Sequence, residues 1–367
     1  MNVLAREEHA RVHPHRAAGE QRVGRTAPVL IVCKHACAAF FGALVADALT
    51  LGTHYEYDAK KIKQFYGDLD KYYAPGERTG GQTHGVGWGA RNFHGGNGLG
   101  PAKKAGEQTD YGDYNILLLE HLAAHPHGRI DLAQLIPRWQ ERLKTWRAWM
   151  CTQTRQTLQQ VQQGVPLGQL GGMSNAMAIR HAAAYAVYTN EDDIVHACRT
   201  AMFTHRETSA HQGAEFFARV TFRIIHKGLS AREAIKEVAA ESPAFVQSKV
   251  QQALDRAARA LDGSRALSKE EYADDLALTS MARLWDVGKT EPIKVGKASP
   301  TEGTLPGSLY FILKYEGDLA GAIKANAMVS MRWAAPMMDI LCLCRAYRDL
   351  CVCLCVCLSI YICTHMI

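Results

Sequence analysis

The sequence is poor in the patterns of β-structure and of single-sign charge. Over its 367 residues almost no segment alternates apolar and polar side chains, which argues against a sheet-based fold. The formal net charge of +6 is small. Basic and acidic residues are mixed along the chain, without the basic stripe that marks a nucleic-acid-binding protein. We therefore expect an all-α protein with no nucleic-acid partner.

Cysteine is scarce through most of the chain. Only four cysteines precede residue 340, which fits a reducing compartment and predicts a cytoplasmic location. The other seven lie between Cys342 and Cys363, where several alternate with Val or Leu. Thiolate metal ligands usually come as C-x2-C pairs with a distant partner pair, so this spacing predicts no metal site.

Other familiar signals are also missing. The glycine-rich stretch 74–106 has no strand before it, so a dinucleotide-binding fingerprint is not supported. Residues 1–30 have little apolar periodicity and lack the apolar core of a targeting peptide, which predicts a disordered basic head. We found no tandem repeat of fixed period.

What the chain does have is a large apolar content with helical spacing. It is 47% hydrophobic and 21% charged, typical of a globular protein with ample core. Residues 31–330 are therefore predicted to form one compact all-α domain, which we expect to be monomeric. Residues 289–307, rich in proline and glycine, are predicted to be a loop. The expected helical segments are residues 36–51, 132–161, 176–188, 191–204 and 246–261.

One stretch, residues 106–119, organises the rest. A glycine-rich loop ends at Thr109, which suits a helix N-cap, and Asp110 and Asp113 would lie in the first turn. Their three-residue spacing places both carboxylates on one face. A hydroxyl and two carboxylates offer hard oxygen ligands for Mg²⁺ or Ca²⁺. The alternative is an ordinary acidic N-cap.

Two further acids precede this stretch. Asp47 is the only charge in the apolar segment 36–51, where burying an unpaired carboxylate is expensive, and Glu56 follows in the connecting turn. A functional interpretation brings Asp47 or Glu56 to the same site as Asp110. The alternative makes Asp47 a hydrogen-bonding clasp for neighbouring backbone and Glu56 a surface residue. Further along, backbone N–H groups at the turn Gly171–Gly172 could cradle an anion.

Taken in order, these segments resemble the ADP-ribosylglycohydrolase family, in particular its J1-crystallin-like branch. The resemblance covers residues 36–330 approximately and implies a compact helical bundle with a di-magnesium centre. The implied reaction is hydrolysis of a glycosidic bond at the anomeric carbon of an ADP-ribosyl group. The matching segments are residues 42–49, 55–58, 106–113, 171–172, 204–205 and 303–308.

The resemblance assigns roles at the metal site. Thr109 and Asp110 match the family's Thr-Asp metal ligands. Where many members have a second consecutive Asp, this chain has Tyr111, so that ligand is lost or replaced by Asp113. Glu56 matches an acid near the metals. By the same resemblance, Glu56 and Asp110 are the expected catalytic residues, with Glu56 positioning or deprotonating the attacking water.

The resemblance also assigns a substrate pocket. Gly171, Gly172 and His205 match positions that line the ADP-ribose pocket, so the expected partner is ADP-ribose or an ADP-ribosylated substrate. The competing hypothesis is a catalytically inactive, crystallin-like or scaffold member of the same fold, which Tyr111 favours.

The chain departs from the family near its C-terminus. The last metal motif, a Gly-Asp with further ligands, should follow residue 330, but residues 331–336 read Met-Arg-Trp-Ala-Ala-Pro. Alternating Cys and Val is what a TG repeat encodes, so residues 331–367 are interpreted as an aberrant tail from a frame change or unspliced sequence. The alternative makes residues 350–362 a membrane anchor, although that run is short for a bilayer. Loss of this motif predicts weak metal binding and slow or absent turnover.

Overall fold

The computed structural model describes residues 27–54, 59–78, 102–125, 129–262 and 300–328. Within these ranges there is no strand, only the isolated bridges Gly172–His205 and Ala176–Pro300, so the all-α prediction is confirmed. The helices are α1 (Ala27–Thr50), α2 (Ala59–Tyr66), α4 (Asp110–Ala124), α5 (Leu132–Leu143), α6 (Thr152–Gln162), α7 (Glu191–Ala201), α8 (Thr208–Lys227), α9 (Ala231–Glu241), α10 (Ala244–Leu261), α12 (Thr301–Lys314) and α13 (Leu319–Met328). The 3₁₀ helices are η1 (Leu51–Thr53), η2 (Leu167–Gln169) and η3 (Ala182–Ala186).

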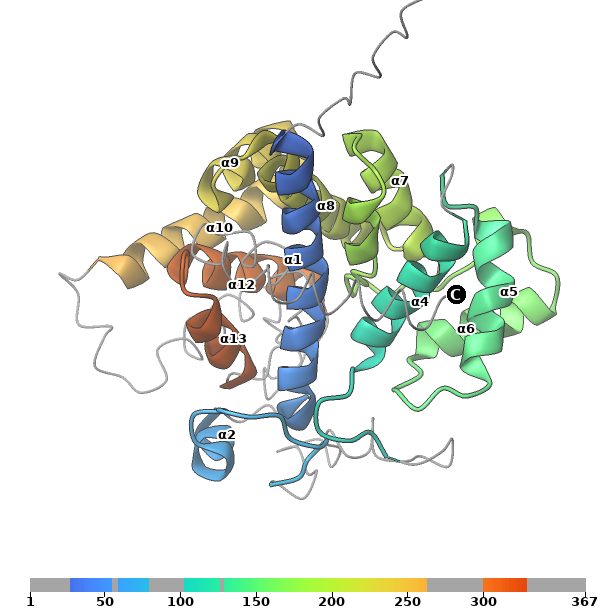
Figure 1. Ribbon diagram of the computed structural model, residues 1–367, viewed down its shortest axis with the longest axis horizontal. Coiled ribbons are helices and arrows are strands. Elements are labelled where there is room, and N and C mark those ends of the chain that lie inside the picture. Colours follow the sequence, from blue (N-terminus) through green and yellow to red (C-terminus); the bar gives the residue numbers. More distant parts are fainter. Residues whose placement is uncertain (1–26, 55–58, 79–101, 126–128, 263–299, 329–367) are drawn as a thin grey trace, which may run out of the picture.

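Helix α1 runs through the middle of the molecule (Figure 1). It packs against α4, α8, α13 and η3, with α4–α7 to one side and α9–α13 to the other. Within the described ranges, Lys34–Thr53 is the one segment long and apolar enough to cross a membrane, and most of it is buried inside the protein. A central core helix has the same composition, so its position in the fold accounts for this apolarity.

A continuous apolar core joins these helices. One cluster of buried side chains extends from Ala36 in α1 to Ile323 in α13, which supports a single domain. Trp139 and Trp146 lie in this core, and Trp139 Nε1 donates to Tyr114 Oη at 2.9 Å. Helix α1 begins at Ala27, so the end of the predicted head is helical, and residues 1–26 lie outside the described part.

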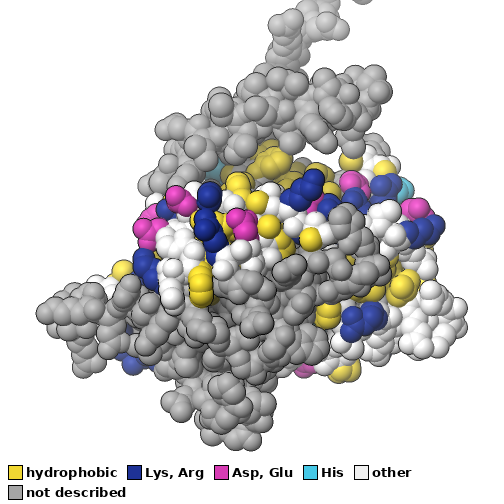
Figure 2. All heavy atoms as spheres, turned by 90° about the horizontal axis from the view of Figure 1, so that it is seen from below, with side chains coloured by type: hydrophobic (Ala, Val, Ile, Leu, Met, Phe, Trp, Pro, Cys, Tyr) yellow, Lys and Arg dark blue, Asp and Glu magenta, His cyan; other side chains and the backbone are white. Residues whose placement is uncertain are grey.

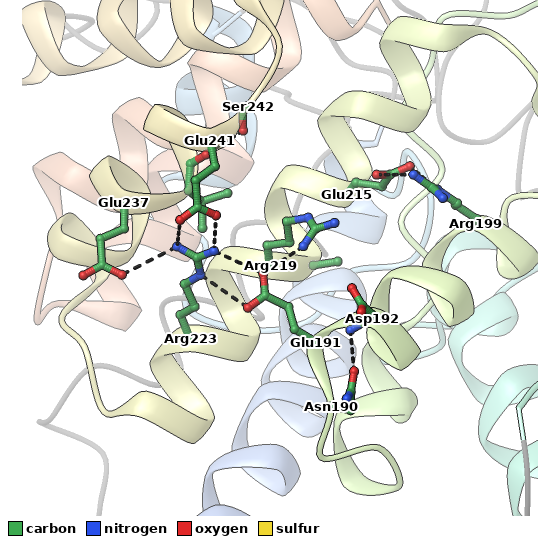
Figure 3. Close-up of polar contacts among 12 residues, drawn as sticks. Asn190, Glu191, Asp192, Arg199, Glu215, Arg219, Arg223, Glu237, Glu241 and Ser242 are labelled. Atoms are coloured by element: carbon green, nitrogen blue, oxygen red, sulfur yellow. Dashed lines mark hydrogen bonds and ion pairs between the residues drawn. The ribbon is translucent and has the colours of Figure 1, made fainter.

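Arg223 on α8 forms hydrogen bonds and ion pairs with both α7 and α9 (Figure 3). The buried Arg223 side chain donates to Glu191 at the start of α7, at 3.3 and 3.4 Å, and to Glu241 at the end of α9. Arg219 adds a third hydrogen bond to Glu191 at 3.0 Å. A buried guanidinium requires such partners, because an unpaired charge in the core is strongly destabilising. This network fixes α7, and with it the segment that leads to His205.

Residues 176–188 are not the helix that their composition predicts. Only Ala182–Ala186 is helical, as the short 3₁₀ helix η3, although the whole segment 176–185 is buried. Its backbone is bonded to other parts of the chain: Ala182 N donates to Asn115 Oδ1 at 3.0 Å, and Ala176 pairs with Pro300. The prediction was wrong because tertiary partners replace the helical hydrogen bonds.

Residues 301–307 are helical, which corrects the predicted loop 289–307. Helix α12 begins at Thr301 and continues through Pro306 and Gly307. Thr301 is held at the helix start by Asn175, whose carbonyl oxygen accepts from Thr301 N at 2.9 Å and from Oγ1 at 2.5 Å. Burial of the segment against α10 outweighs the low helix propensity of proline and glycine.

From below, basic and acidic side chains are interspersed over the described part of the surface (Figure 2). On this face the picture agrees with the mixed charge of the sequence. The predicted aberrant tail, residues 331–367, lies outside the described residues.

Candidate functional site

Thr109 caps the helix that carries the predicted metal ligands. Its backbone is extended, and its Oγ1 accepts a hydrogen bond from Tyr111 N at 3.2 Å, so α4 begins at Asp110. This confirms the predicted N-cap. Asp110 and Asp113 both lie in the first turn, where the positive end of the helix favours a carboxylate. The Asp110 side chain is 3% exposed.

Asp47 reaches this helix start from α1. Its Oδ2 accepts from Thr109 N and its Oδ1 accepts from Thr109 Oγ1, both at 2.6 Å, although the two residues are 62 apart in the chain. The clasp interpretation of Asp47 is therefore confirmed, and the clasped backbone is that of the predicted metal-site segment. A side chain at Gly112 would sit 2.5 Å from Asp47 Oδ2, so glycine is required for this approach.

The Asp47 carboxyl is hard to ionise in this position. Burial raises its pKa to about 7, the two hydrogen bonds from Thr109 lower it, and the nearby charges of Asp110 and Asp113 raise it further. Asp110 and Asp113 thus lie close enough to disfavour a charge on Asp47, and a cation bound among these carboxylates would relieve that repulsion.

Asp113 has a cation beside it already. Lys103 Nζ lies 2.5 Å from Asp113 Oδ2, and the lysine side chain is only 5% exposed. Burial raises the pKa of Asp113, while the Lys103 ammonium lowers it. Sequence reasoning missed Lys103, because nothing in the spacing of a lysine ten residues before an aspartate signals this contact.

These donors fit Mg²⁺ in kind. Carboxylates and a hydroxyl are the hard oxygen ligands that Mg²⁺ prefers, and the Lys103 ammonium shows that the Asp113 carboxylate accommodates a cation. In the described ranges, however, no three His, Cys, Asp or Glu side chains are grouped as a metal site. The described residues therefore do not by themselves form a metal site. Glu56, predicted as a further ligand and as a catalytic residue, lies outside them.

The predicted substrate residues Gly171, Gly172 and His205 come together. Gly172 forms an isolated bridge with His205, in which Gly172 N donates to Thr204 O at 3.1 Å and Arg206 N donates to Gly172 O at 2.9 Å. Gly171 N donates to Gln160 Oε1 at 2.8 Å. Both glycine N–H groups are thus bonded to protein acceptors, so a phosphate held by them would have to exchange with these partners.

A buried arginine links this pair of segments to α4. Arg180 donates from Nη1 to Thr204 Oγ1 at 2.7 Å, and its guanidinium carbon lies 3.5 Å from the centre of the Tyr114 ring. Thr204 Oγ1 is also 2.9 Å from His205 Nδ1. Tyr114 is one turn after Asp110 on α4, so Arg180 connects the segment at Thr204 and His205 to the helix that carries Asp110. Sequence reasoning did not identify Arg180.

A family model described as ADP-ribosylglycohydrolase matches residues 30–332. A solved structure titled "ADP-ribosylglycohydrolase-related protein complex" is similar, with a TM-score of 0.49 and 16% sequence identity over 85% of this chain and 87% of that chain. The search of curated proteins found no match.

Proposed function

Since the chain belongs to the ADP-ribosylglycohydrolase family, we propose that it is a Mg²⁺-dependent hydrolase that cleaves the glycosidic bond at the anomeric carbon of an ADP-ribosyl group. The observation that carries the proposal is the pair of hydrogen bonds between Asp47 on α1 and Thr109 at the start of α4. Asp47 holds both the backbone and the hydroxyl of Thr109, which fixes the first turn that presents Asp110. Catalytic groups need this kind of rigid support, because small misplacements cost large factors in rate.

In the proposed site Thr109, Asp110 and Asp113 hold the metal, with Glu56 as a further ligand. Family members bind two ions, and here the site is expected to be incomplete. A bound Mg²⁺ supplies Lewis-acid and orienting chemistry for the ribose hydroxyls and the attacking water. Glu56 would position that water or accept its proton, which requires a carboxylate within hydrogen-bond reach.

The substrate side of the site is proposed at Gly171, Gly172 and His205. The left-handed backbone of Gly171, with φ of 99°, lets residues 171–172 lie directly against residues 203–206. His205 stands at this junction, 5% exposed, with its Nδ1 held by the Thr204 hydroxyl. A fixed imidazole can contact a ribose or phosphate oxygen without a large loss of side-chain entropy.

Weak metal binding is part of the proposal. Thr53 Oγ1 donates to Ala327 O at 3.1 Å, so the end of α13 lies beside η1, which follows α1. Thr53 is three residues before Glu56 in the sequence. The segment that follows α13 in the family carries the last metal motif, and in this chain it reads Met-Arg-Trp-Ala-Ala-Pro. The second candidate function, an inactive crystallin-like or scaffold protein, is favoured by this replacement and by Tyr111.

Release of free ADP-ribose, measured by chromatography, tests the proposal. The substrates to compare are ADP-ribosyl-arginine, ADP-ribosyl-serine, O-acetyl-ADP-ribose and poly(ADP-ribose). We expect slow release from at least one of them in Mg²⁺, none in EDTA, and a rate at least about 100-fold lower in Asp110→Ala, because a lost metal ligand removes several kcal/mol of transition-state stabilisation. Asp70→Ala, at an exposed acid, is the matched control. No release from any substrate would favour the scaffold.

A further inference from the structure

The lysine that faces Asp113 is held more rigidly than a surface lysine. The loop before α4 turns sharply at residues 104–107, where Gly106 has φ of 85° and Glu107 accepts from Lys104 N at 2.7 Å. Glu107 is also paired with Arg147 at 2.5 Å. The loop is therefore fixed on both sides of the turn, and Lys103 is directed onto the first turn of α4.

The burial of Lys103 needs an explanation. A lysine with 5% of its side chain exposed has lost most of its hydration, which is unfavourable unless an anion replaces the water. Asp113, at 2.5 Å, is that anion. By contrast, the adjacent Lys104 is exposed and has no such partner in the described part of the chain. The pair is thus a specific feature of this loop.

We propose that Lys103 is an internal counter-cation for Asp113, which a divalent ion must displace before Asp113 can act as a ligand. This rests on the proposed function, since it takes Asp113 to belong to the metal site. Lys103 then lowers the metal affinity of the site without contacting the metal or the substrate. An ammonium and a divalent cation compete for the same carboxylate oxygens, so removing the ammonium leaves Asp113 available to the metal alone.

The probe is Mn²⁺, whose binding to the full chain is measured by electron paramagnetic resonance and by calorimetry, with no substrate present. We expect Lys103→Met to tighten Mn²⁺ binding by at least about tenfold, because the competing charge is gone. Lys103→Arg keeps the charge and is expected to resemble the wild type. Lys104→Met is the matched control and should leave the affinity unchanged. Melting in EDTA checks folding, and Lys103→Gln replaces Lys103→Met if that variant is unfolded.

A double-mutant cycle shows whether Lys103 acts through Asp113. In an Asp113→Asn background, Lys103→Met should no longer change the Mn²⁺ affinity. An unchanged or weaker affinity in both neutral variants of Lys103 overturns the proposal, as does an equal gain in the Asp113→Asn background. Failure of the proposed function has a different signature: Mn²⁺ binding to the wild type would then be absent or unaffected by Asp110→Ala.

Discussion

Raising the pH from about 5 to about 8 in EDTA is expected to destabilise the wild-type chain by about 3 kcal/mol more than Asp47→Asn. Burial raises the pKa of Asp47 from 3.8 to about 7, so the folded protein holds this proton over a range in which the unfolded chain has released it. The stability that Asp47 contributes is complete below its unfolded pKa and is lost as the pH rises through the folded value. Asparagine does not titrate, so Asp47→Asn should not lose stability in this way as the pH rises.

Chemical denaturation at several pH values, for both proteins, measures the difference. Buried histidines act in the opposite sense, because burial lowers the pKa of His181 to about 3 and that of His121 to about 4. The stability that these histidines contribute is lost as the pH falls below the pKa of a free histidine. This effect is the same in the wild type and in Asp47→Asn. Parallel stability profiles for wild type and Asp47→Asn would show that Asp47 is ionised at no unusual cost.

Gly171→Ala is expected to lower the free energy of unfolding by about 3 kcal/mol or more. A Cβ at this position would lie 2.7 Å from the backbone oxygen of Phe203, and φ of 99° is unfavourable for any residue with a side chain. The backbone oxygen cannot move without disturbing the pairing of Gly172 with His205. We therefore expect the substitution to damage the proposed substrate pocket as well as the stability.

Gly164→Ala provides the matched control, because Gly164 also has a left-handed backbone, with φ of 73°, but has no atom within 4 Å of the added Cβ. Gly164→Ala should lower the free energy of unfolding by only about 1 kcal/mol, the cost of placing an alanine in a left-handed backbone conformation. Urea denaturation of the two variants separates the steric contribution from the conformational one. Equal losses would contradict the close packing of Gly171 against residues 203–206.

Short-range features of the sequence were sufficient to predict part of this fold and of the candidate site. Thr109 is an N-cap because the chain before it is rich in glycine and the chain after it is acidic and then apolar, and the structure agrees. The helices α7, α8 and α10 follow their apolar spacing. Val246, Val250, Ala253 and Ala257, for example, form the buried stripe of α10.

What the sequence did not predict depends on partners far away in the chain. Residues 176–181 are not helical, because Pro300 pairs with Ala176 and Asn115 accepts a hydrogen bond from the backbone of Ala182. Residues 301–307 are helical despite their glycines and proline, because they are buried. Lys103 illustrates the same limit at the site: only the folded loop shows that it faces Asp113.

The hydrogen bonds between Asp47 and Thr109 confirm the clasp interpretation of Asp47, whereas its role at the metal site belongs to the proposal. The carboxylate satisfies a backbone N–H, as a structural clasp does, and it does so at the residue that precedes Asp110. A buried polar group in this position stabilises the fold, and in the proposed site the same two hydrogen bonds would orient Asp110.

The most direct test of the central claim is the affinity of the chain for ADP-ribose, measured by calorimetry in Mg²⁺ and in EDTA. If the first turn of α4 holds a cation that binds ADP-ribose, Mg²⁺ should tighten binding to the wild type and to Asp70→Ala by at least about tenfold, or 1.4 kcal/mol. Asp110→Ala should show no effect of Mg²⁺. An affinity that is the same in Mg²⁺ and in EDTA for the wild type, or a Mg²⁺ effect that survives in Asp110→Ala, would contradict the proposed site.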